Sequence, residues 1–91
     1  MKVKVAKRLY RMSRKEYQGL LEVAKEQVPM GVYALEKGDY AELRCDKCTS
    51  TTQLKGMIRA FKSQGFKVYA NGRRCARIAA NIGEQVRKHG G

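Results

Sequence analysis

Two stretches of the chain share one layout: Ser13–Gln27 reads SRKEYQGLLEVAKEQ, and Ser50–Gln64 reads STTQLKGMIRAFKSQ, 37 positions later. Each begins with a Ser that can cap a helix, followed three residues later by Glu or Gln, which is the capping-box pattern. Apolar residues then recur at i, i+3, i+4 and i+7 in both stretches. The pattern predicts helices over 14–27 and 51–64.

The segments around these helices have the composition of strands. Val32–Leu35 and Tyr40–Arg44 flank a Gly-containing link and predict a β-hairpin. Phe66–Ala70 precedes an Asn-Gly turn and predicts a further strand. Residues 3–10 predict one first strand with a bend near its middle. Residues 73–89 have apolar positions at helical spacing and predict a C-terminal helix.

This order of elements predicts an α+β fold. Two βαβ halves joined by a hairpin define a ferredoxin-like βαββαβ sandwich, pseudo-symmetric, here with an extra C-terminal helix. The expected architecture is a four-stranded antiparallel sheet with both helices on one face. A length of 91 residues allows one domain, 1–91. The predicted core side chains are Leu20, Leu21, Ala24, Met57, Ile58 and Phe61.

The charge of the chain is high and unevenly distributed. Lys and Arg number 20 against 8 Asp and Glu, a net charge of +12. Residues 1–15 hold seven basic side chains and no acid, residues 16–43 have a net charge of −4, and residues 44–91 have a net charge of +9. This segregation predicts a face directed at a polyanion. The expected partner is nucleic acid, DNA or RNA, and the alternative partner is an acidic protein.

The basic side chains gather in the sequence near two expected helix starts, where backbone amides add donors for a phosphate. Tyr side chains can stack on unpaired bases. The predicted nucleic-acid site comprises Lys7, Arg8, Arg11, Arg14, Lys15, Arg73, Arg74 and Arg77, with Tyr10 and Tyr40 as stacking residues.

Cysteine and histidine are the metal-ligand types that the sequence offers. Cys45 and Cys48 form a CxxC that Cys75 and His89 can complete as a Cys₃His zinc set. A second closely spaced pair is missing, and cytosolic thiols stay reduced. The sequence therefore predicts structural thiols and no cofactor, with zinc binding or redox chemistry as the alternatives.

A catalytic constellation is not predicted, because the sole His stands near the C-terminus and no Ser-His pair or phosphate loop occurs. No apolar run approaches the ~20 residues of a membrane helix. The basic start also lacks the apolar region of a signal peptide. These features predict a cytoplasmic protein without a membrane partner.

The sequence as a whole predicts a non-catalytic nucleic-acid-binding protein that contacts the phosphate backbone. Its size and charge are typical of domains that phages and mobile elements encode, an analogy at the level of fold and size. The alternative function is a small protein-interaction module, an inhibitor or adaptor that binds an acidic surface of a host protein such as a nucleic-acid enzyme.

Overall fold

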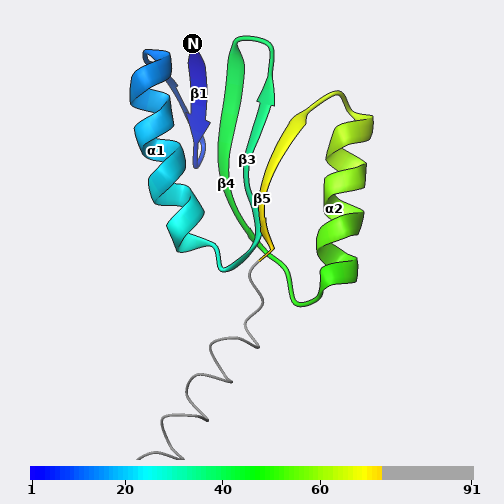
Figure 1. The fold of residues 1–91 in the computed structure, drawn as a ribbon. Helices are drawn as coiled ribbons and strands as arrows, with labels where there is room; N and C mark the ends of the chain where they lie inside the picture. The colour runs from blue at the N-terminus through cyan, green and yellow to red at the C-terminus, as the bar shows by residue number, and fades with distance from the viewer. Residues whose placement is uncertain (73–91) are drawn as a thin grey trace, which may run out of the picture.

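The computed structural model describes residues 1–72, which form five strands and two helices (Figure 1). The elements in chain order are β1 Lys2–Val5, β2 Arg8–Arg11, α1 Arg14–Gln27, β3 Met30–Lys37, β4 Tyr40–Lys47, α2 Thr51–Ser63 and β5 Lys67–Gly72. The two predicted helices, the hairpin of β3 with β4, and the strand at β5 are confirmed. The predicted C-terminal helix over 73–89 lies outside the described residues.

Side-chain caps explain where the helices begin. The Ser13 hydroxyl accepts a hydrogen bond from the Glu16 amide at 3.2 Å, and the Ser50 hydroxyl accepts one from the Gln53 amide at 3.1 Å. These bonds satisfy backbone donors that have no partner within the helix. The end of α2 is fixed by Gly65, whose φ of +89° lies in the left-handed region that favours glycine.

The five strands form one mixed sheet in the order β2-β1-β4-β3-β5. Strand β1 pairs parallel with β4, whereas its pairing with β2 is antiparallel, as are those of β3 with β4 and β5. The α+β class is therefore confirmed, but the strand order differs from that of a ferredoxin-like sandwich. The prediction of one bent first strand is wrong, because the chain reverses at Ala6–Lys7 to form a hairpin of β1 and β2.

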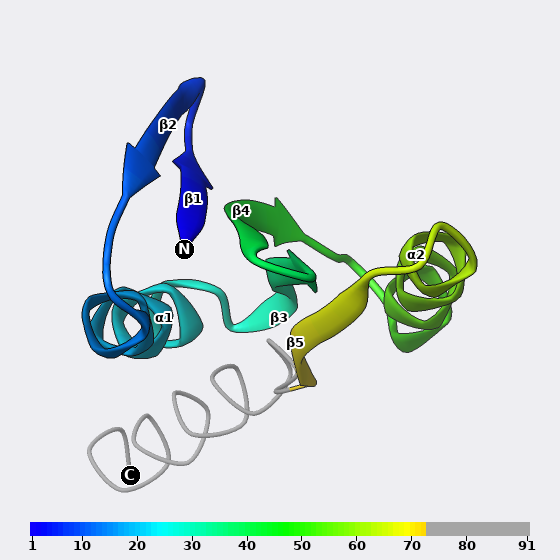
Figure 2. The same ribbon diagram turned by 90° about the horizontal axis from the view of Figure 1, so that it is seen from above.

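The N-terminal hairpin accounts for the different architecture. In a ferredoxin-like sheet the last strand pairs with the outer edge of the first, but here β2 occupies that edge and β5 pairs with β3. The crossovers β2-α1-β3 and β4-α2-β5 consequently advance in the same direction along the sheet. The strands of the first crossover, β2 and β3, run opposite to those of the second, β4 and β5. Because such crossovers prefer the right hand, α1 and α2 lie on opposite faces (Figure 2). The prediction that both helices cover one face is wrong.

Two hydrophobic layers follow from this arrangement. On the α1 side the fully buried residues include Tyr17 and Val3, and on the α2 side Leu35 and Leu54 are buried. The predicted core residue Leu20 is instead 40% exposed, because it lies on the flank of α1. The other predicted core residues pack in these two layers, as expected.

The α1 side of the sheet is the side that carries Val3, and the α2 side is the opposite one. No helix within residues 1–72 has the length and apolar content needed to cross a lipid bilayer.

Candidate nucleic-acid interface

The sequence-predicted site residues lie on both sides of the sheet. Tyr10 pairs with Val3, and Arg8 pairs with Val5, so both share the α1 side with these core valines. Arg11 pairs with Lys2 and therefore lies on the α2 side. Tyr40 also lies on the α2 side, since its neighbour Ala41 packs in the α1 layer. The two predicted stacking tyrosines are thus on opposite sides of the sheet.

The remaining predicted cations are dispersed as well. Lys7 is in the turn between β1 and β2, and Arg14 with Lys15 forms the start of α1. Arg73, Arg74 and Arg77 lie outside the described residues. The described residues of the predicted site are therefore divided between the two sides of the sheet, the β1–β2 turn and the start of α1.

A different set of cations is aligned by the strand register. Arg11 is paired with Lys2, Lys2 with Tyr40, and Tyr40 with Lys37. Since paired residues point to the same side of a sheet, these four side chains form one row across four strands on the α2 side. With a strand spacing of about 4.8 Å, the row spans about 14 Å. We call it the cation row.

The ends and the centre of the cation row have defined surroundings. At one end, the Lys37 ammonium donates a hydrogen bond to the Gln64 carbonyl at 3.2 Å and lies 5.5 Å from the centroid of the Phe66 ring. In the centre, the Tyr40 hydroxyl donates to Glu42 at 3.5 Å, a long contact. Burial, and then the Glu42 carboxylate, raise the pKa of Tyr40 above the value of about 10 of a free phenol, which is already neutral at physiological pH. Its ring is therefore an uncharged surface among cations.

The acidic side chains of β4 on this side are already paired. Arg44 makes ion pairs with Asp46 and with Glu42, the latter at 3.5 Å, and its guanidinium lies 5.0 Å from the centroid of the Phe61 ring. Among residues 1–72, neither Lys2 nor Arg11 has a carboxylate within ion-pair distance. Asp39 lies near Lys2 and Arg11 but pairs with the N-terminal ammonium at 3.9 Å. The three cations of the row therefore make no ion pair within this part of the protein.

The two helices reinforce the difference between the sides. Helix α1 carries three basic and three acidic side chains, whereas α2 carries three basic ones and no acid. The basic residues of α2 are Lys55, Arg59 and Lys62. The net positive charge of the helical layers thus lies on the α2 side, together with the cation row.

Sequence reasoning missed several of these cations. Lys2 and Lys4 alternate with Val3 and Val5, and this period-two pattern was the available signal that both lysines share the face opposite the core. Lys37 pairs with Tyr40 because the turn between them has two residues. The sequence alone did not determine the length of this turn, so this pairing could not be predicted.

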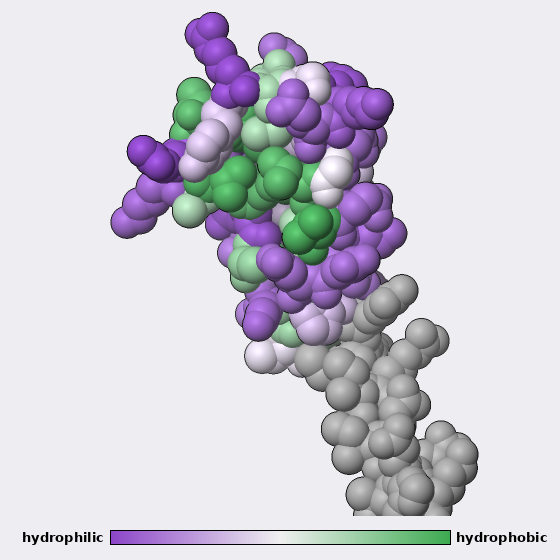
Figure 3. Space-filling view, turned by 90° about the vertical axis from the view of Figure 1, so that its left-hand side faces the viewer, coloured by the Kyte–Doolittle hydropathy of each residue, from purple (hydrophilic) through white to green (hydrophobic). Residues whose placement is uncertain are grey.

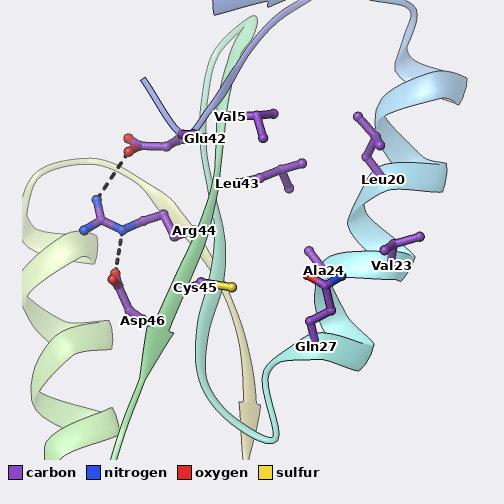
Figure 4. Close-up of a pocket in the computed structure, with 11 residues that line it drawn as sticks. Val5, Leu20, Val23, Ala24, Gln27, Glu42, Leu43, Arg44, Cys45 and Asp46 are labelled. Carbon is purple, nitrogen blue, oxygen red and sulfur yellow. Dashed lines mark hydrogen bonds and ion pairs between the residues drawn. The ribbon is translucent and has the colours of Figure 1, made fainter. Parts of the chain in front are cut away.

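The α1 side has a different character, because an apolar groove lies between α1 and the strands β1 and β4. Leu20 and Val23 form one wall, and Val5, Leu43 and Cys45 face them from the strands (Figure 4). The groove has a volume of about 520 Å³. A hydrophobic patch with hydrophilic surroundings is visible on this side of the molecule (Figure 3). Val23 is 53% exposed and Leu20 40% exposed there, so they belong to a contiguous apolar surface rather than being isolated exposed side chains.

The two cysteines of the CxxC point to opposite sides of the sheet. Cys45 is exposed in the α1-side groove, whereas Cys48 is buried on the α2 side, where its thiol donates to the Met57 sulfur at 3.4 Å. Burial raises the pKa of the Cys48 thiol. The pair therefore does not converge on one metal ion, and residues 1–72 contain no group of three or more His, Cys, Asp or Glu placed to hold one. Cys75 and His89 lie outside the described residues.

Comparisons with protein-family models, curated proteins and solved structures found no match for this chain. Its function therefore has to be inferred from the chemistry of its two sides.

Proposed function

We propose that the protein binds nucleic acid, DNA or RNA, through its phosphates and without catalysis of its own. The carrying observation is the separation of charge across the sheet: the cation row and a helix with three basic and no acidic residues share the α2 side. Lys and Arg side chains that neutralise phosphates release condensed counterions, which drives binding. The cations proposed to contact phosphate are Lys2, Lys4, Arg11, Lys37, Lys55, Arg59 and Lys62.

Salt dependence tests this proposal directly. Fluorescence anisotropy with labelled DNA and RNA, each single- and double-stranded, gives the binding constant at salt concentrations from about 50 to 200 mM. With four to six of these seven cations in contact with phosphate at one time, the slope of log K against log salt is about −3 to −5, from −0.7 to −0.9 per contact. Absence of binding to all four ligands at about 100 mM salt would contradict the proposal.

A pair of triple variants separates a defined site from general attraction by charge. The test variant replaces Lys55, Arg59 and Lys62 of α2 with Gln. The control replaces three lysines with Gln as well. These are Lys25, Lys47 and Lys67, which lie outside both α2 and the cation row. Each variant loses three positive charges, but only the test variant is expected to reduce the slope by about two units. Equal reductions in both would show that binding has no preferred side.

A protein-interaction module is the second candidate, and the apolar groove is the observation that favours it. Nucleic acid would not bury Leu20 and Val23, whereas apolar side chains of a protein partner would. In this case the basic α2 side would meet an acidic surface of the partner. The uncharged double variant Leu20→Asn and Val23→Asn is expected to leave oligonucleotide binding unchanged, and loss of that binding in a folded variant would place the nucleic-acid site in the groove.

A further inference from the structure

We infer that the cation row binds a single-stranded nucleic acid, with phosphates on Lys2, Arg11 and Lys37 and a base stacked on Tyr40. This inference rests on the proposed function and adds the class of ligand. It concerns one surface, the α2 side of strands β2, β1 and β4 with the end of β3 that carries Lys37. Helix α2 packs on β3 and β5 and reaches β4 where Phe61 meets Arg44, so no helix of residues 1–72 covers the part of the surface formed by β2 and β1 (Figure 2).

The topology disfavours insertion of the basic hairpin into duplex DNA. A two-stranded ribbon can enter the major groove, which is about 12 Å wide. Here β1 is hydrogen-bonded on both edges, to β2 and to β4, so the hairpin belongs to a sheet of five strands. Four strand spacings of about 4.8 Å make that sheet about 19 Å across. The cation row therefore meets its ligand as part of a broad surface.

The position of Tyr40 adds the specific argument for an unpaired strand. Its ring lies between Lys2 and Lys37 in the row, so a chain whose phosphates contact these lysines passes over an aromatic surface. The faces of the bases are covered by stacking in a duplex but are accessible in a single strand. Leu9, 57% exposed and paired with Lys4, provides a second apolar contact in the adjacent register row.

The expected contribution of Tyr40 can be stated as a change in affinity. Stacking of one base on an aromatic side chain corresponds to a factor of about 5 to 150 in binding constant. Tyr40→Ser is expected to weaken binding of a single-stranded 12-mer by this factor and to leave duplex binding unchanged. Tyr40→Phe retains the ring and loses only the 3.5 Å hydrogen bond to Glu42, so it is expected to bind within about twofold of the wild type.

A tryptophan reporter gives a readout that does not depend on affinity. The sequence contains no Trp, so Tyr40→Trp introduces a single fluorophore into the cation row. Val23→Trp, on the exposed flank of α1, is the control. Both full-length variants, checked by circular dichroism, are titrated at about 100 mM salt with oligo(dT), oligo(U) and a 12-base-pair duplex. We expect the two single strands to quench Tyr40→Trp, and neither to quench Val23→Trp.

The outcomes distinguish the inference from the function on which it rests. Duplex binding that equals or exceeds single-strand binding, without quenching of Tyr40→Trp, would overturn the inference and leave the proposed function intact. Quenching of both reporters alike would also overturn it, because the ligand would have no preferred side. Absence of binding to every oligonucleotide would overturn both.

Discussion

Replacing Gly31 with Ala is expected to destabilise the sheet at the start of β3, just after the loop that follows α1. A Cβ atom at this position would lie 1.9 Å from the Asp46 carbonyl oxygen and 2.9 Å from a methyl carbon of Val28. The added methyl group therefore has no room between the backbone of β4 and the buried Val28 side chain. Gly31 also has a φ of +157°, a conformation that residues with a side chain rarely adopt.

The magnitude follows from the displacement that the methyl group requires. Moving the carbonyl oxygen to an acceptable distance separates β3 from β4 by more than about 1 Å. The adjacent bond from the Cys48 amide to the Met30 carbonyl, 2.9 Å long, would then exceed hydrogen-bonding distance. Loss of one bond costs about 1 kcal/mol, and overpacking adds about 1–3 kcal/mol. We expect Gly31→Ala to lower the free energy of unfolding by about 2–4 kcal/mol.

Gly19→Ala is the matched control, because it makes the same substitution where space is open. Apart from the adjacent backbone of the helix itself, no atom of residues 1–72 lies within 4 Å of a Cβ built at Gly19, which is exposed in the middle of α1. Alanine is expected to stabilise the helix there by about 1 kcal/mol. Urea denaturation followed by circular dichroism at 222 nm measures both changes. Unfolding free energies of Gly31→Ala and wild type within about 0.5 kcal/mol of each other would refute this account of the β3–β4 contact.

Two further predictions concern ionisable side chains. Tyr17→Phe removes the hydroxyl that donates to Glu36 at 2.9 Å, and it is expected to cost about 1 kcal/mol at pH 7. Burial, then the Glu36 hydrogen bond, raise the pKa of Tyr17 above its unfolded value of about 10, so the stability from the neutral phenol is complete below pH 10 and declines above it. Urea midpoints from pH 7 to 11 should therefore fall more for the wild type than for Tyr17→Phe, and equal declines would contradict this cause. For the thiols, Cys45 is expected to react with a maleimide in the folded protein and Cys48 only after denaturation, because Cys48 is buried and its pKa is raised. Trypsin separates the two cysteines, so mass spectrometry reads each one, and comparable labelling of both in the folded state would show that Cys48 is accessible.

Local sequence signals predicted the elements that depend on neighbouring residues. Both helices were predictable because capping residues and apolar periodicity act within one segment, and the turn at Gly38 marked the β3–β4 hairpin. The turn between β1 and β2 carried no such signal. Ala6 has a φ of +54°, a conformation that usually selects Gly or Asn, and neither stands in this turn. The hairpin is therefore maintained by its pairing with β4 and by the packing of Val3 in the α1 layer.

The candidate site was less predictable than the elements, because it depends on pairing between distant strands. The sequence identified Arg11 and Tyr40 as candidates, but their common side follows only from the pairing of both with Lys2. The register of β2 with β1 also places Tyr10 and Arg8 on the opposite side, because they pair with Val3 and Val5. A charge count locates basic segments, whereas the strand register determines which cations share a surface.

The N-terminal hairpin connects the unexpected topology with the proposed function. By occupying the outer edge of β1, β2 directs β5 to the far edge of the sheet, and α2 packs there against β3 and β5. In a ferredoxin-like arrangement the second helix would share the face of α1, and the opposite face would carry no helix at all. Here the α2 side is divided between a basic helix and a strand surface that holds the cation row. The hairpin thus supplies Lys2 and Arg11 to the row and, through the strand order, places the positive charge of α2 on the same side of the sheet. A ligand that binds both must therefore lie along this side, which is why the α2 triple variant and Tyr40→Trp probe the same side of the sheet.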